Sequence, residues 1–352
     1  MRKGRLTVLL VVLMAAMLAV SACGKKTSPK EAMQNAWAAS MKMKSFAFDG
    51  SFVIDELALP SGAQAADLPF AELIRNASLA VSGAYVQNPL RMEMDLKLAL
   101  PGDMALTVDV PVIFTEDKVY VRIPDIPMLP LGDAAGKFVE LDPAGLTEEN
   151  GGTLPAVDVE LQRKLSGEVL GILFRSLDEK IYFQELKKDD VSGLPGDLKA
   201  DRYVKFSVTP ENFDAFMQTL ADQVLPALVD LLLENEEYRS MLRITEDELK
   251  RAKEEIASNG PESLRNSLEE LKKNLKVNEI SLTGALKGDH LVYQKLKGNV
   301  EATENGETTK IGFTFDIRYD KINEDVTFKH DIPADALTME EFRRSLFPGL
   351  AF

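Results

Sequence analysis

A strict alternation of apolar and polar side chains constrains the fold of this chain more than any other feature. Across residues 91–98, every even position is apolar and every odd position is charged. A period of two recurs, less strictly, at residues 46–54, 106–110, 119–123 and 311–319. Because successive side chains of a strand point to opposite faces, these segments predict antiparallel strands with one dry and one wet face.

Apolar residues three and four positions apart predict helices before, between and after these strands. Ser28 and Pro29 have the character of an N-cap and a first helical residue, and this helix is expected to run to about Met43. Helical spacing also covers residues 161–177 and a block at about 210–275. This order predicts an α+β fold with helices packed on one concave antiparallel sheet, and two separate domains are the alternative.

The first 22 residues have the organisation of a secretory signal. Three basic residues precede an apolar run at 8–20, which is shorter than the roughly 20 residues needed to cross a bilayer. Two small residues then stand directly before Cys23. This arrangement resembles the lipobox of bacterial lipoproteins, which implies cleavage after Ala22 and a thioether-linked diacylglycerol on Cys23.

This reading divides the chain into three parts. Residues 1–22 are expected to be removed, and residues 23–30 to form the lipidated N-terminus and a short tether. Residues 31–352 are expected to form a single domain. Cys23 is the sole cysteine, so the chain cannot form an internal disulfide or a cysteine-based metal site.

The charge of the chain excludes one large class of partners. Acidic residues outnumber basic ones 56 to 41, which gives a formal net charge of −15. Such a chain repels the phosphate backbone, so we expect no nucleic acid partner. The membrane partner is expected to be reached through the lipid on Cys23.

The sequence offers little for catalysis. Its two histidines, His290 and His330, stand apart from other candidate ligands or nucleophiles, and the chain holds none of the common catalytic motifs. Asp320, Asn323 and Asp325 offer oxygens suited to a hard cation, but turn formation explains them better. We therefore expect no enzymatic activity, no metal and no cofactor.

A set of aromatic and methionine side chains is the main candidate for a binding site. Such side chains suit an adaptable apolar cavity, because methionine fills irregular gaps. The alternative is that helices fill this space completely and leave an ordinary core. The candidate residues are Trp37, Phe46, Phe48, Phe52, Met92, Met94, Phe213, Phe216, Met217, Phe313, Phe315 and Phe328.

Two segments of the mature chain carry a family resemblance. After the lipobox and one helix comes MKSFAFDGSFVI at residues 43–54, and the closing segment FTFDIRYDKINEDVTFKHDIP spans residues 313–333. These resemble the lipoproteins of the LolA/LppX superfamily and related uncharacterised Firmicute lipoproteins. The resemblance implies an incurved antiparallel half-barrel closed by helices on its concave face, with lipids or lipoproteins bound in that space. The long helical block at 210–275 departs from the smaller members.

The sequence therefore leads to a membrane-anchored, non-enzymatic protein that binds an apolar or lipid ligand between sheet and helices. The resemblance favours the outer face of the cytoplasmic membrane of a Gram-positive bacterium. A second hypothesis is a structural lipoprotein with a dry core that docks another envelope protein. An enzyme is the third hypothesis and has the least support in the sequence.

Overall fold

The computed structural model describes residues 27–59, 77–100, 106–126, 131–141, 159–258, 268–304 and 306–346. Their strands form one open antiparallel sheet of eleven strands in the order β6-β5-β4-β3-β2-β1-β11-β10-β9-β8-β7. The strand bounds are β1 Ser45–Ala58, β2 Ser78–Val86, β3 Arg91–Leu100, β4 Leu106–Thr115, β5 Val119–Arg122, β6 Phe138–Leu141, β7 Phe183–Leu186, β8 Arg202–Val208, β9 Leu275–Lys287, β10 His290–Glu304 and β11 Glu307–Asp320. The predicted signal segment and Cys23 lie outside the described residues.

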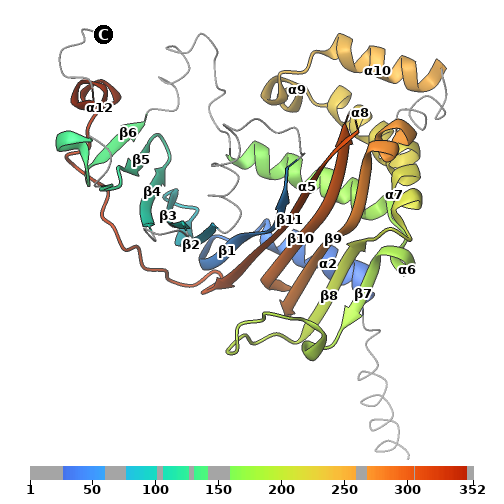
Figure 1. The fold of residues 1–352 in the computed structure, drawn as a ribbon, viewed down its shortest axis with the longest axis horizontal. Coiled ribbons are helices and arrows are strands. Elements are labelled where there is room, and N and C mark those ends of the chain that lie inside the picture. Colours follow the sequence, from blue (N-terminus) through green and yellow to red (C-terminus); the bar gives the residue numbers. More distant parts are fainter. Residues whose placement is uncertain are drawn as a thin grey trace, which may run out of the picture.

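The sheet curves strongly, and helices occupy its concave side (Figure 1). This confirms the predicted α+β class and the incurved open sheet. The helical elements are α2 Pro29–Ser40, η1 Gly132–Ala134, α5 Val159–Ser176, α6 Glu179–Tyr182, η2 Lys188–Asp190, α7 Phe213–Thr219, the π-helical turn η3 Leu220–Val224, α8 Leu225–Glu234, α9 Glu236–Leu242, α10 Glu246–Ser258 and α12 Met339–Leu346.

The predicted start of the first helix is confirmed at the level of single contacts. The side chain of Ser28 accepts a hydrogen bond from the amide of Glu31, and Pro29 opens α2. Pro29 and Lys30 therefore belong to the helix and not to the tether. Directly before α2, Arg202 at the start of β8 donates to the hydroxyl of Thr27 at 2.9 Å and to its carbonyl at 2.7 Å. This Arg202 clamp fixes the place where the chain enters the fold.

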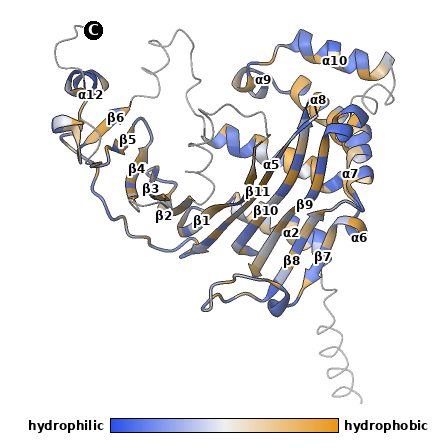
Figure 2. Ribbon diagram, viewed as in Figure 1, coloured by the Kyte–Doolittle hydropathy of each residue, from blue (hydrophilic) through white to orange (hydrophobic). Residues whose placement is uncertain are grey.

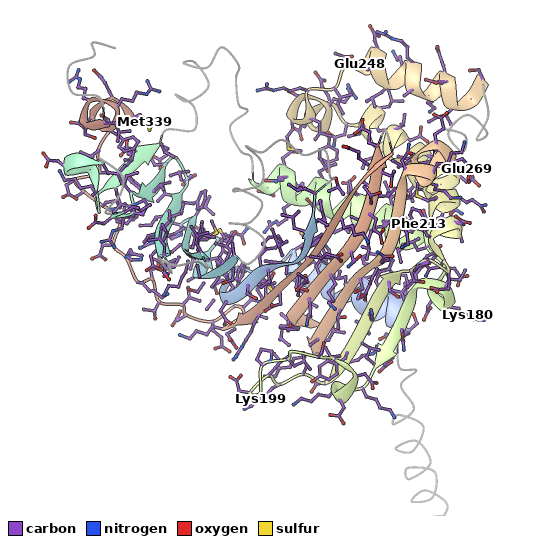
Figure 3. The ribbon with its side chains drawn as sticks, in the orientation of Figure 1. Lys180, Lys199, Phe213, Glu248, Glu269 and Met339 are labelled. Carbon is purple, nitrogen blue, oxygen red and sulfur yellow. The ribbon has the colours of Figure 1, made fainter. Side chains whose placement is uncertain are left out.

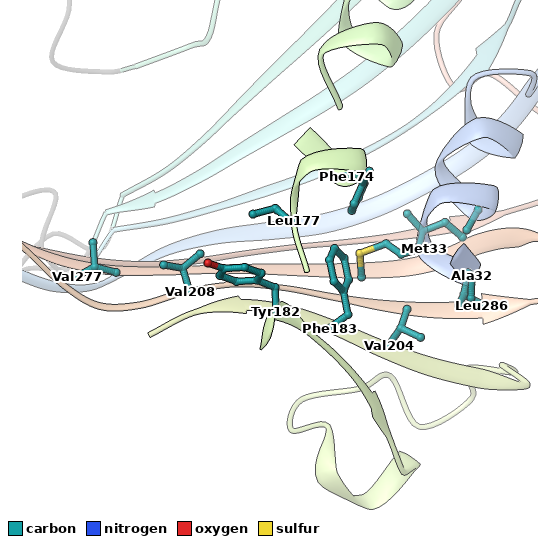
Figure 4. Packing of buried hydrophobic residues seen from close by; sticks show 12 residues of the cluster. Ala32, Met33, Phe174, Leu177, Tyr182, Phe183, Val204, Val208, Val277 and Leu286 are labelled. Atoms are coloured by element: carbon teal, nitrogen blue, oxygen red, sulfur yellow. The ribbon is translucent and has the colours of Figure 1, made fainter. Parts of the chain in front are cut away.

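Two hydrophobic clusters pack the β7–β10 half of the sheet. The first lies on the concave face under α2, α5 and α6, where Met33, Phe174 and Phe183 meet Val204 (Figure 4). The second lies on the convex face, where residues 187–201 cover Tyr203 and Tyr293. Because both faces are covered here, apolar residues such as Tyr203 and Val204 stand side by side in the sequence.

Two glycines allow the strands in the middle of the sheet to approach closely. A Cβ added at Gly50 would lie 2.3 Å from the carbonyl oxygen of Asp316, and one added at Gly83 would lie 1.9 Å from the carbonyl oxygen of Glu93. Backbone atoms cannot move aside as a flexible side chain can. Glycine is therefore required at both positions for the sheet to keep this shape.

After β11 the chain crosses the convex face as an extended strap, defined here as residues 321–337 (Figure 1). The strap ends with Leu337 bridging Val139 of β6. The sequence analysis counts Phe328 among the candidate residues of the apolar site, and the structure contradicts this placement. The ring of Phe328 lies 4.0 Å from the guanidinium carbon of Arg91. Arg91 and Met92 point to opposite faces, so Phe328 lies on the convex face.

A buried carboxylate holds the strap in place. Glu93 is only 1% exposed, and its two carboxylate oxygens accept the amides of Lys329 at 2.8 Å and His330 at 2.9 Å. Beside it, Asp95 contacts Lys329 Nζ at 2.6 Å and His330 Nε2 at 2.9 Å. Strand β3 is thereby tied to a segment more than 200 residues away in sequence.

Replacing Glu93 with alanine is expected to release the strap. The change leaves two backbone N–H groups without their acceptor, and each such buried group costs about 1–3 kcal/mol. Amide exchange at Lys329 and His330 should therefore accelerate by at least about 30-fold. Asp109→Ala removes an exposed carboxylate from the same sheet face and should leave these rates unchanged. If amide exchange at Lys329 and His330 is unchanged in Glu93→Ala, then Glu93 does not hold the strap in place.

The strap is also expected to loosen in acid. Desolvation raises the pKa of Asp95, but hydrogen bonds from Lys329 and His330 and their charges outweigh it, so the pKa lies below the usual 3.8. A depressed pKa stabilises the fold above the unfolded-state pKa, and this stability is lost as the pH falls through the folded-state value. The melting temperature of wild type should exceed that of Asp95→Asn at pH 6, and the difference should shrink below about pH 3.9. If the difference in melting temperature between wild type and Asp95→Asn stays constant from pH 6 to below about pH 3.9, then the ionised Asp95 does not stabilise the strap.

Candidate apolar ligand-binding face

A continuous row of apolar side chains crosses the concave face from β4 to β8. The strand register places its members directly opposite one another from strand to strand. In spatial order the row is Val108, Leu98, Leu79, Phe52, Phe315, Leu296, Leu282 and Phe206. We call it the Phe52 row, and it lies across the concave face seen in Figure 1.

Further rows run parallel to it, nearer the start of β1. Phe48 stands opposite Gly83 and Tyr319, and Met94 follows Gly83 in the same row. Phe46 stacks on Tyr85 with ring centroids 5.0 Å apart and meets Tyr319 edge-on at 5.5 Å. From β6 to β8, the rows that cross β1 between Phe46 and Phe52 contain no charged side chain. The Gly50 row ends at Glu185 of β7, whose carboxylate pairs with Arg202 at the start of β8. This part of the concave face is thus uncharged from β6 to β8.

The two halves of this face differ in what covers them. The described helices α2, α5 and α6 pack over β7–β10, and α12 packs against β6. Among the described residues, neither hydrophobic cluster includes a side chain of β1–β5. The side chains of Phe52, Leu79, Leu98 and Val108 are instead half-buried. This β1–β5 half, which we call the open wing, presents apolar surface without a described helix packed on it.

The predicted site residues separate into two groups. Phe46, Phe48, Phe52, Met92, Met94 and Phe315 share the concave face of the open wing and β11, as predicted, and Phe313 stands opposite Ile54 one row beyond. Phe213, Phe216 and Met217 belong to α7, and the first two pack against the first cluster. Figure 3 places Phe213 beside the β8–β9 end, away from the open wing. These three residues fill the core.

Trp37 takes an intermediate position. It lies on α2 one helical turn after Met33, whose side chain packs over Gly284 of β9. Its indole Nε1–H is buried and meets no hydrogen-bond acceptor among the described residues. The structure therefore places Trp37 on the helix-covered half, away from Met92 and Met94.

Sequence reasoning did not name several residues that complete the Phe52 row. Leu79 was missed because the segment 78–86 contains Gly83, which interrupts the alternation. Leu98 and Val108 were recognised as strand residues but lack the aromatic or thioether character used to select candidates. Alternation alone would have found them, since each occupies the same face as Met94 or Val110.

One polar pair stands within this apolar surface. Gln294 Nε2 donates to the hydroxyl of Tyr319 at 2.7 Å. Gln294 shares a cross-strand row with Gly50 and Gly284, and so lies at the border between the open wing and the helix-covered half. Desolvation raises the pKa of Tyr319, so its hydroxyl stays protonated at neutral pH.

The helical block lies beyond the β8–β9 end of the sheet. Residues Phe213–Glu234 are long and apolar enough to cross a bilayer, and few of them are buried. Helix α8, which lies within this segment, is strongly hydrophobic. Helix α10, which follows later in the chain, is mainly hydrophilic (Figure 2). Helix α8 packs against α10, α9 and α5. The predicted block thus forms a rim at one end of the concave face.

One cluster of charged groups on the convex face forms the contact between β3 and the strap. Glu93, Asp95 and His330 bring potential metal-ligand atoms within 4.8 Å of one another. Both oxygens of Glu93 already accept backbone amides, and Asp95 already pairs with Lys329. His290 lies on the convex side near Asp320 and Arg318. Asn323 accepts the amide of Lys44 at 2.8 Å, which agrees with its predicted turn role.

Comparison with known proteins adds no identification. No protein-family model matches the chain, and no curated protein matches it closely enough to count as a relative.

Proposed function

We propose that this chain is a lipid-anchored, non-enzymatic extracytoplasmic protein that binds an apolar ligand on the concave face of its open wing. The anchor is the diacylglycerol on Cys23, and the location is the outer face of the cytoplasmic membrane of a Gram-positive bacterium. The relationship to the LolA/LppX superfamily is part of the same proposal. Its ligand class is a lipid or another molecule with long apolar chains.

The observation that carries the proposal is the half-buried Phe52 row. A folded chain gains about 25 cal/mol for each Å² of apolar surface removed from water, so apolar strand faces are normally covered. On β7–β10 they are covered by α2, α5 and α6. On the open wing Phe52, Leu79 and Leu98 lack a described helical cover. An apolar ligand laid across these strands would gain affinity from the same burial.

The shape of the surface also favours a long, flexible ligand. The Phe52 row spans strands that lie about 4.8 Å apart, so the half from Val108 to Phe315 extends over roughly 19 Å. A surface this wide and free of charge suits acyl chains better than a compact polar metabolite. Met92 and Met94 add side chains that adapt to ligands of different shape.

The decisive experiment is native mass spectrometry of the chain from Gly24 onward, purified from its own host, followed by organic extraction. We expect a co-purified lipid at a stoichiometry near one to one, and the extract would name its class. Beginning at Gly24 removes the covalent lipid, so any lipid found is a bound ligand.

A bare mass combined with no binding of added lipids would overturn the proposal. The interaction lipoprotein with a dry core would then be the better description. Binding of lipid to an unfolded fraction is excluded by recording the charge-state distribution, which separates folded from unfolded chains in the same spectrum.

A further inference from the structure

On the concave rows of the open wing and its border, the side chains of Gln294 and Tyr319 bring an amide and a hydroxyl together in one hydrogen-bonded pair. The ring of Tyr319 is held by Phe46, edge-on at 5.5 Å, and stands directly opposite Phe48. The hydroxyl therefore has a fixed position within an apolar surface. A polar group so placed costs free energy unless it finds a partner.

The hydrogen bonds of the pair leave a donor unused. Gln294 Nε2 donates to the Tyr319 oxygen, so the phenolic hydrogen points elsewhere, and no described residue accepts it. Turning the amide by 180° would let the phenol donate to Gln294 Oε1, but then the amide hydrogens would lack an acceptor. In either orientation the pair presents at least one N–H or O–H that no described side chain or carbonyl satisfies.

The surroundings define which acceptor fits. The concave rows between Phe46 and Phe52 hold no cation to neutralise a phosphate or a carboxylate. An ionised group in such surroundings would lose its hydration without a compensating charge. A neutral carbonyl oxygen, in contrast, needs only a hydrogen-bond donor and no compensating charge. In a molecule with long apolar chains, the ester group that joins chain to glycerol supplies such an oxygen.

We propose that the Gln294–Tyr319 pair binds the ester carbonyl of an acylated lipid whose chains lie along the Phe52 row. This inference rests on the proposed function and adds a chemical criterion to it. The pair selects ester-linked lipids over ether-linked lipids of the same length, while the apolar rows supply most of the affinity.

The test compares a diacylglycerol with the dialkyl ether glycerol of equal chain length, using the chain from Gly24 onward. Wild type should bind the diacylglycerol about tenfold more tightly, since one neutral hydrogen bond contributes about that factor. Tyr319→Phe and Gln294→Met should each reduce this preference toward unity, because each weakens binding of the ester lipid more than binding of the ether lipid.

Tyr293→Phe is the matched control. Tyr293 is also a tyrosine of the central strands, but it is 1% exposed on the convex face, and burial raises its pKa to about 12. Removing its hydroxyl should leave the ester preference intact. Thermal unfolding of all three variants establishes that the comparison concerns folded protein.

The outcomes separate this inference from the function on which it rests. Equal binding of ester and ether lipids by wild type would overturn the role of the pair and leave the proposed lipid-binding function standing. A preference for the ester lipid that survives in Tyr319→Phe and Gln294→Met would also overturn the role of the pair. Failure of wild type to bind either lipid would overturn the proposed lipid-binding function, and the role of the pair would fall with it.

Discussion

Replacing Leu98 with glutamate is expected to abolish binding of an apolar ligand while the chain stays folded. Leu98 stands between Leu79 and Val108 in the Phe52 row and is half-buried. An ionised carboxylate covered by an acyl chain would lose its water without gaining a partner, at a cost of several kcal/mol. We therefore expect affinity to fall at least about 100-fold, measured by displacement of a fluorescent long-chain fatty acid.

The control for this variant lies on the opposite face. Thr107→Glu adds the same charge to the neighbouring strand β4, but Thr107 is exposed and points away from the Phe52 row. This variant should bind as wild type does. If Leu98→Glu keeps its fold and still binds the probe, then the open wing is not the binding surface.

Replacing Gly83 with alanine should destabilise the open wing strongly. The added Cβ would lie 1.9 Å from the carbonyl oxygen of Glu93 and 2.8 Å from the ring of Phe48. The oxygen belongs to the neighbouring strand, so β2 and β3 must separate locally. We expect the free energy of unfolding to fall by about 3 kcal/mol, measured by urea denaturation.

Gly196→Ala is the matched control for Gly83→Ala. A Cβ added at Gly196 would meet no atom within 4 Å among the described residues, and the backbone there does not adopt a positive φ. The urea concentration at the unfolding midpoint of Gly196→Ala should equal that of wild type or rise slightly, because alanine reduces the conformational freedom of the unfolded chain. If Gly83→Ala and Gly196→Ala have equal unfolding midpoints, then β2 and β3 can separate at Gly83 without a loss of stability.

The sequence predicts those elements that depend on interactions between residues only a few positions apart. The Ser28 cap is confirmed by its hydrogen bond, and the Thr245–Glu248 and Thr338–Glu341 pairs form caps of the same local kind. Gly306, between β10 and β11, has the positive φ that glycine adopts without strain. The alternation at 91–98 gave the correct faces of β3, because one side of that strand is apolar throughout.

The missed elements are those whose pattern depends on distant parts of the chain. Strand β8 was not predicted, because Tyr203 faces the cover formed by residues 187–201 while Val204 faces α2, so the period of two disappears. Phe328 was placed on the wrong face for a related reason. Its partner Arg91 is more than 200 residues earlier, and no local pattern reports that contact.

The candidate site was predicted in part for the same physical reason. Phe46, Phe48 and Phe52 are correctly placed because they repeat every two residues on one strand. Phe213 and Phe216 look identical in composition, yet they pack against Tyr182 and its neighbours. Composition cannot distinguish an aromatic residue that fills a core from one that lines open surface, since that difference depends on which helix covers which strand.

Under the proposed lipidation of Cys23, the Arg202 clamp would set the orientation of the molecule relative to the membrane. Thr27 is four residues after Cys23, so under the proposed lipidation the clamp lies within about 14 Å of the lipid. Strand β9 runs from the rim of α8–α10 to this end, and its 13 residues span about 43 Å. A ligand that passes the rim would therefore enter from the side facing away from the anchoring bilayer, so its donor or acceptor would stand outside that membrane.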